Sequence, residues 1–179
     1  MKFSQAISEG DGISLIVEVA DADGARAAAT EGAEAVVARR ALGDEVDVPV
    51  LWRGSPRASD AAAAGAHAWV ASLDDDADGD DHVGLDRVVA VRDEEELERA
   101  LELFDPEIVL FAVGDDDDAD AVQRALDLLP DLPAGKLAIA EVPVSSRDQV
   151  DELERAGVDA VIVGARNVAG LVGDAAPEV

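Results

Sequence analysis

The chain has 179 residues, 49% of them hydrophobic, and its 41 acidic and 14 basic residues give a formal net charge of −27. This length suits one domain with a real core. The acidic excess argues against nucleic acids and anionic membranes as partners. Because the chain contains no cysteine, disulfides, thiolate metal sites and cysteine nucleophiles are excluded.

The acidic residues are spread over the whole sequence rather than gathered in a tail. Molar salt shortens the Debye length to about 3 Å and screens the resulting self-repulsion. We therefore expect a surface adapted to high salt. Residues 1–11 lack a basic flank followed by an apolar stretch, and no apolar run approaches the roughly 20 residues of a membrane span. The sequence thus predicts a cytoplasmic protein.

Eight short apolar runs, rich in β-branched residues, alternate with segments of good helix formers. The runs predict strands at 14–19, 35–38, 49–52, 68–72, 87–91, 108–113, 137–141 and 160–164. The segments between them predict helices at 22–31, 58–64, 93–104, 119–129 and 146–156. This alternation favours a parallel sheet whose strands are buried on both faces.

An internal repeat strengthens this interpretation. Gly32, Gly65 and Gly157 each follow a predicted helix and precede a predicted strand, in segments of the form Gly-Ala/Val-x-Ala. Glycine at such a joint supplies the left-handed residue that ends a helix. We expect residues 1–179 to form a single compact (β/α)8 TIM-type barrel with short helices and loops. An open doubly wound sheet is the alternative, although no G-x-G-x-x-G follows any predicted strand.

Two acidic segments and two histidines raise the question of metal binding. Residues 74–84 begin like a calcium loop, but Leu85 stands where the closing bidentate glutamate is required. We therefore expect solvated loops there and at 115–118. His67 and His82 lack a second histidine or cysteine nearby, which argues against zinc. No metal and no cofactor is predicted.

Three stretches resemble indole-3-glycerol-phosphate synthase, a (β/α)8 lyase of tryptophan biosynthesis. Residues 14–19 resemble the first strand of that family, 48–53 its third strand, and 138–164 its seventh and eighth strands. The family closes an indole ring with loss of carbon dioxide and water, and its lysines after the first and third strands serve the substrate carbonyl. Those two lysine positions read Ala20 and Arg53 in this sequence.

Further family positions are also changed. The carboxylate that ends the fifth strand reads Ala90, and the asparagine of the sixth strand is replaced within 111–113. The two lysines of the chain, Lys2 and Lys136, precede the first and seventh strands, on the face of a barrel that serves stability. The resemblance therefore implies a synthase-like barrel whose chemistry is incomplete.

The candidate catalytic residues are Glu18, Arg53 and Glu141. Glu18 and Glu141 end the first and seventh strands and can form an acid–base pair with separated pKa values. Alternatively, each carboxylate is solvated or forms a structural ion pair with Arg53 or Arg166. Arg53 stays protonated, so it suits binding of an anion better than proton transfer.

The candidate phosphate-binding residues are Gly164, Ala165 and Arg166, after the last strand. Backbone donors and a guanidinium are suited to a phosphate, and barrels bind phosphate at this place.

Three functions stay open. The first is a divergent, shortened synthase relative that binds a phosphorylated small molecule without the full synthase chemistry. The second is a non-catalytic barrel for protein interaction or regulation, which predicts a filled barrel mouth. The third is a full synthase that uses Arg53 as its cation. The sequence predicts neither the oligomeric state nor whether the chain is an enzyme.

Overall fold

The computed structural model describes residues 2–9, 12–43, 46–74, 84–114, 120–166 and 168–172. Its sheet is a closed barrel in which every neighbouring pair of strands is parallel, in the order β1 to β8 and back to β1. The strands are β1 (Ser14–Val19), β2 (Ala35–Ala38), β3 (Val50–Trp52), β4 (Ala68–Ala71), β5 (Asp86–Val91), β6 (Ile108–Phe111), β7 (Leu137–Glu141) and β8 (Ala160–Gly164).

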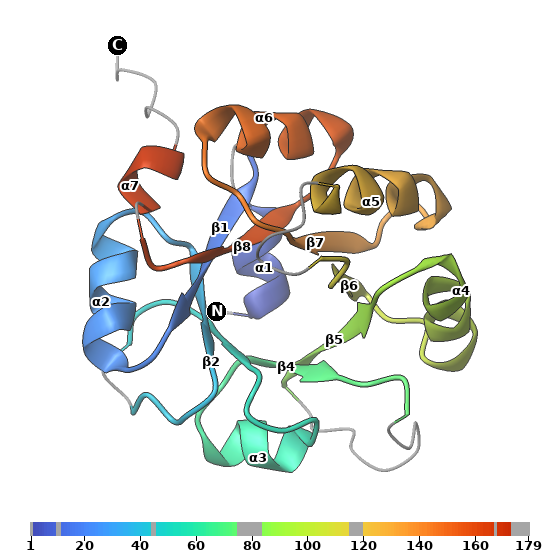
Figure 1. Cartoon of the computed structure of the whole chain (residues 1–179). Coiled ribbons are helices and arrows are strands. Elements are labelled where there is room, and N and C mark those ends of the chain that lie inside the picture. Colours follow the sequence, from blue (N-terminus) through green and yellow to red (C-terminus); the bar gives the residue numbers. More distant parts are fainter. Residues whose placement is uncertain are drawn as a thin grey trace.

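Helices surround this barrel, and one more lies within the ring of strands in Figure 1. The helices are α1 (Phe3–Ser8), α2 (Ala22–Thr30), α3 (Ala58–Ala63), α4 (Glu94–Leu103), α5 (Ala121–Leu128), a 3-10 turn η1 (Leu129–Asp131), α6 (Arg147–Ala156) and α7 (Val168–Leu171). The outer helices α2 to α6 follow strands, as a (β/α)8 barrel requires. The helix seen at the centre of the ring in this view is α1, which lies at the barrel end where β5 begins.

The closed sheet confirms the predicted barrel and shows that the open-sheet alternative is wrong. All eight predicted strands are present, and four of them have the predicted bounds. The described residues between β2 and β3, and those between β4 and β5, form no helix, which accounts for part of the short length. Most of the predicted acidic loop at 74–84, with His82, and all of the loop at 115–118 lie outside the described residues.

The barrel has two apolar layers because successive strand residues point to opposite faces. One layer lies inside the ring and the other between strands and helices. Phe3 and Ile7 of α1 belong to the inner layer and are 0% and 2% exposed. Asp86, at the start of β5, accepts a hydrogen bond of 2.7 Å from the backbone N–H of Ser4. The helix α1 thus closes the amino-terminal end of the barrel, and it lies outside the helices predicted from the sequence.

The repeated joints have a common hydrogen-bond geometry. Gly32, Gly65 and Gly157 have φ of 104°, 73° and 101°, which confirms the predicted left-handed conformation. Two residues after Gly65, the backbone N–H of His67 donates to the carbonyl of Val50, and the Val50 N–H donates to His67 Nδ1 at 3.1 Å. The joint therefore fixes the register of β3 against β4 through both backbone groups of Val50.

The last copy of the repeat uses the same arrangement. The N–H of Asp159 donates to the carbonyl of Ala138, and the Ala138 N–H donates to a carboxylate oxygen of Asp159 at 2.7 Å. Burial raises the pKa of Asp159, and the hydrogen bond from Ala138 partly offsets that effect. The polar residue of this joint is thus an acceptor for the N–H of Ala138, the second residue of the preceding strand β7.

His67 predicts a pH-dependent stability. Burial lowers the pKa of His67 below its usual value near 6.5, against an opposing effect of the Asp86 charge. The unfolded chain therefore binds this proton more readily than the folded one. The stability that His67 contributes is complete above about pH 6.5 and is lost as the pH falls through the lower pKa of the folded state.

The measurement is the free energy of unfolding by denaturant from about pH 8 to about pH 5, the range in which histidine titrates. His67→Asn is the matched variant, because asparagine keeps an acceptor oxygen and does not titrate. We expect the wild-type curve to fall more steeply than that of the variant below about pH 6.5. Parallel curves would show that His67 is not the group that titrates.

Candidate functional site

At the mouth of the barrel, where the strands end, charged residues stand at positions whose side chains face the inside of the ring. Ile16, Val37, Leu51, Ile139 and Ile162 all belong to the inner layer. Residues two positions apart on a strand point to the same face. The residues two positions after these five are, in the same order, Glu18, Arg39, Arg53, Glu141 and Gly164. The closed sheet therefore places the predicted residues Glu18, Arg53, Glu141 and Gly164 at one rim, together with an arginine that was not predicted.

An ion pair between Arg53 and Glu141 crosses this mouth. Arg53 follows β3 and Glu141 ends β7, and these strands lie on opposite sides of an eight-stranded ring. Both terminal nitrogens of Arg53 donate to the Glu141 carboxylate, and Nη2 lies 2.8 Å from Oε2. The two side chains are 23% and 26% exposed. A bidentate pair of this kind is the strong form of an arginine–carboxylate interaction.

The surroundings keep Arg53 charged. Hydrogen bonds to Glu141 raise the pKa of Arg53 above its usual value, burial opposes this rise, and the charges of Glu141 and Glu18 add to it. A guanidinium so held does not release a proton near neutral pH. Arg53 can hold an anion or Glu141, but it is not suited to act as a general acid.

Glu18 has a different partner. Arg39, directly after β2, donates from Nε to Oε1 of Glu18 at 3.2 Å, and both side chains are exposed. Each candidate carboxylate thus contacts an arginine, which is the structural ion pair considered as the alternative. The partner of Glu18 is Arg39, however, rather than Arg53 or Arg166.

A pocket of about 440 Å³ lies at the ends of β1, β2 and β8. Its lining residues are Glu18, Val19, Ala20, Arg39, Arg40 and Gly164. Gly164 pairs with Glu18 in the sheet, and a Cβ added to Gly164 would meet no atom within 4 Å. Ala165 and Arg166 follow Gly164 and are exposed. Of the three predicted phosphate-binding residues, only Gly164 lines this pocket.

A second pocket, of about 260 Å³, lies at the ends of β4, β5 and β6 on the same rim. Val70, Ala90 and Ala112 line its apolar part, and Arg92 and Glu96 line its polar part. Arg92 and Glu96 form an ion pair at 2.6 Å. Within the described part of the rim, one hollow is lined by Arg39 and Arg40 and the other lies over small apolar side chains.

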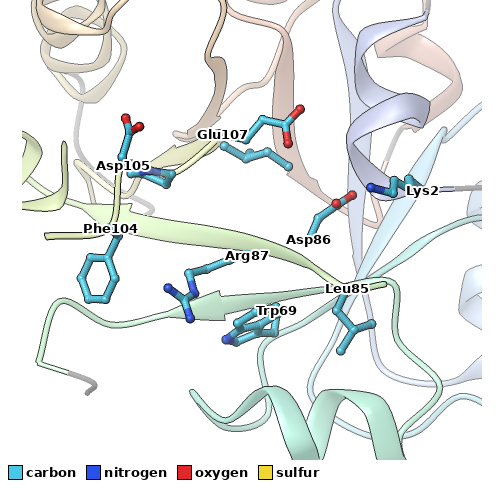
Figure 2. Close-up of a pocket in the computed structure, with 10 residues that line it drawn as sticks. Lys2, Trp69, Leu85, Asp86, Arg87, Phe104, Asp105 and Glu107 are labelled. Atoms are coloured by element: carbon cyan, nitrogen blue, oxygen red, sulfur yellow. The ribbon is translucent and has the colours of Figure 1, made fainter. Parts of the chain in front are cut away.

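A third pocket, of about 410 Å³, lies at the opposite end of the barrel (Figure 2). The guanidinium of Arg87 lies between the rings of Trp69 and Phe104, with its carbon 5.4 Å from each ring centroid. Figure 2 also shows Asp86 and Lys2 beside this pocket. Because this end of a barrel serves stability rather than chemistry, we assign the stacked Arg87 to packing.

Sequence reasoning missed Arg39 and Arg40, although two signals point to them. Arg39 stands two residues after the inward-facing Val37, just as Arg53 stands two residues after Leu51. Adjacent arginines are also unusual in a chain of net charge −27. Among the described residues, no cluster of three or more His, Asp or Glu side chains is arranged to hold a metal ion. The described helices include none with the length and apolar character needed to cross a membrane.

A closed ring of eight parallel strands, with helices outside and charged side chains at the carboxyl ends of the strands, defines a TIM-type (β/α)8 barrel. In sequence the chain is a divergent relative of indole-3-glycerol phosphate synthases. It is 40% identical to the enzyme of Variovorax paradoxus over 82 residues, which are 46% of this chain and 31% of that protein.

Two further synthases show a similar extent of identity. The chain is 34% identical over 84 residues to the synthase of Campylobacter hominis, covering 46% of this chain and 32% of that protein. It is 35% identical over 80 residues to the synthase of Acidithiobacillus ferrooxidans, covering 43% and 29%. The chain thus spans about a third of the length of the curated relatives that it matches. No family model matches it.

Proposed function

We propose that this barrel binds a phosphorylated small molecule at its carboxyl-terminal rim and lacks the full synthase chemistry. The observation that carries the proposal is the position of the arginines. Arg39, Arg40, Arg53 and Arg166 all follow the ends of strands at this rim, in a chain of net charge −27. Guanidinium groups suit phosphate because they donate hydrogen bonds in pairs and stay charged.

The missing chemistry follows from what stands at the rim. The resemblance places the family's lysines at Ala20 and Arg53 and its fifth-strand carboxylate at Ala90. In the structure Ala20 and Ala90 line the two rim pockets, and neither carries a group that transfers a proton. Arg53 is bound to Glu141. These features favour ligand binding without ring closure over a full synthase that uses Arg53 as its cation.

The interaction-module hypothesis predicts a filled barrel mouth. The two hollows at the rim, of about 440 and 260 Å³, favour a ligand instead. Small-molecule sites span about 300–1,000 Å³, so the larger hollow lies in the lower part of this range and the smaller one just below it.

The test is isothermal titration calorimetry in molar KCl with indole-3-glycerol phosphate, the compound in the name of the relatives, and with glycerol phosphate. We expect saturable binding of at least one of these, and none of indole glycerol without the phosphate. The ring-closing reaction, followed by the fluorescence of the indole product, should show no turnover by the wild type or by Arg53→Lys. Binding of neither phosphate compound would contradict the proposal, and measurable turnover would contradict its second part.

A further inference from the structure

The arginine pair after β2 lies beside the position at which the sequence predicted phosphate binding. Arg39 and Arg40 line the 440 Å³ pocket together with Gly164, whereas Arg166 is not among its lining residues. We infer that Arg39 and Arg40 hold the phosphate of a phosphomonoester dianion, against the open backbone at Gly164. This inference rests on the proposed function and names the residues and the ligand charge.

The backbone that carries the pair is held in place by β3. The N–H of Arg53 donates to the carbonyl of Ala38 at 2.9 Å, so pairing of the two strands extends to the residue before Arg39. The ring of Trp52 packs over Gly54, where an added Cβ would also lie 2.8 Å from the carbonyl oxygen of Arg39. Glycine at 54 therefore permits the close packing that fixes where Arg39 leaves the sheet.

Glu18 binds Arg39 and adds a negative charge to this pocket. It accepts one hydrogen bond from Nε of Arg39, and a guanidinium has five donors, so donors remain for a ligand. The Glu18 carboxylate also lines the pocket, and it repels a phosphate dianion. Glu18 is therefore a group that orients Arg39 and opposes the ligand, rather than half of an acid–base pair.

The structure also explains why two adjacent arginines suit one dianion. Arg39 lies two residues after the inward-facing Val37, and Arg40 follows it beyond the end of β2. Both residues line the same hollow. Gly164 lies across the hollow at the end of β8, with no side chain to occupy it. The terminal oxygens of one phosphate group can then contact two cations and the backbone at once. A carboxylate has fewer oxygens and a single charge, so it makes fewer of these contacts.

The experiment compares the dissociation constants of indole-3-glycerol phosphate and of inorganic phosphate for wild type, Arg39→Gln, Arg40→Gln and Arg166→Gln. Arg155→Gln is the matched control, because Arg155 is exposed at the end of α6 that leads to the amino-terminal face. We expect each of the first two variants to weaken binding about 10-fold or more, as loss of a charge-assisted hydrogen bond does. Arg166→Gln should weaken binding less, and Arg155→Gln should leave it unchanged.

Glu18→Gln gives a result of opposite sign. Glutamine keeps an oxygen for Arg39 and removes the charge, so we expect tighter binding of the phosphate probes, with unchanged thermal unfolding in the absence of ligand. Strong loss in Arg166→Gln with wild-type affinity in Arg39→Gln and Arg40→Gln would overturn the inference while the proposed function stands. A wild-type protein that binds neither probe would overturn both.

Discussion

Replacing Phe3 with alanine is expected to lower the free energy of unfolding by about 3–5 kcal/mol, the usual cost of removing a buried phenylalanine. Phe3 has no exposed surface and, with Ile7, fills the amino-terminal end of the barrel interior. A cavity there would face residues of several strands at once, because the inner layer draws on all eight. We therefore place this substitution among the most destabilising in the chain.

Denaturant unfolding in molar KCl measures the effect, with Leu103→Ala as the control. Leu103 is on α4 and is 51% exposed, so its loss should change stability by no more than about 0.5 kcal/mol. Equal stability of Phe3→Ala and Leu103→Ala would mean that α1 does not close the barrel.

Breaking the Arg53–Glu141 pair has the second large expected effect. Glu141→Gln leaves the half-buried Arg53 charge without its carboxylate, which costs about 3–5 kcal/mol for fully buried pairs. Because both side chains keep about a quarter of their exposure, solvent reduces this cost, and we expect about 1–3 kcal/mol. Arg53→Met should have a similar effect for the same reason.

A double-mutant cycle separates the pair from its surroundings. The cycle uses Arg53→Met, Glu141→Leu and the two combined. We expect each single substitution to lower stability and the double variant to recover much of that loss, since apolar replacement of both partners is often neutral. Strictly additive losses from the two single substitutions would show that these side chains do not interact across the mouth.

The strands could be predicted because burial on both faces makes them continuous apolar runs. Residues 14–19, 35–38, 137–141 and 160–164 match the strands of the structure in full. The predicted strand at 87–91 begins one residue after the start of β5 at Asp86. Composition alone does not place Asp86 in the strand, because aspartate is typical of loops rather than strands. Its carboxylate is buried because it binds the N–H of Ser4, 82 residues away, and no local pattern reveals such a partner.

The helix α1 shows a similar limit. It has six residues and no side-chain hydrogen bond at its N-cap, so local signals for a helix are weak. Its stability comes from Phe3 and Ile7 inside the barrel. That contact exists only once the strands have closed.

The rim residues were predictable in position but not in their pairing. Closure of the ring brings Glu18, Arg53 and Glu141 together, as expected from the ends of their strands. The sequence could not decide which arginine meets which carboxylate, because that depends on side-chain reach across the mouth. Arg39 was overlooked, although its parity relative to Val37 already placed it there.

The most direct test of this account is a crystal structure of the chain with indole-3-glycerol phosphate, grown in KCl without added phosphate or sulfate. We predict that the phosphate lies between Arg39, Arg40 and Gly164 at the ends of β1, β2 and β8, with Arg53 and Glu141 beside it at the mouth. Phosphate density at the opposite end of the barrel, near Arg87, or a ligand-free rim at saturating concentration would contradict it.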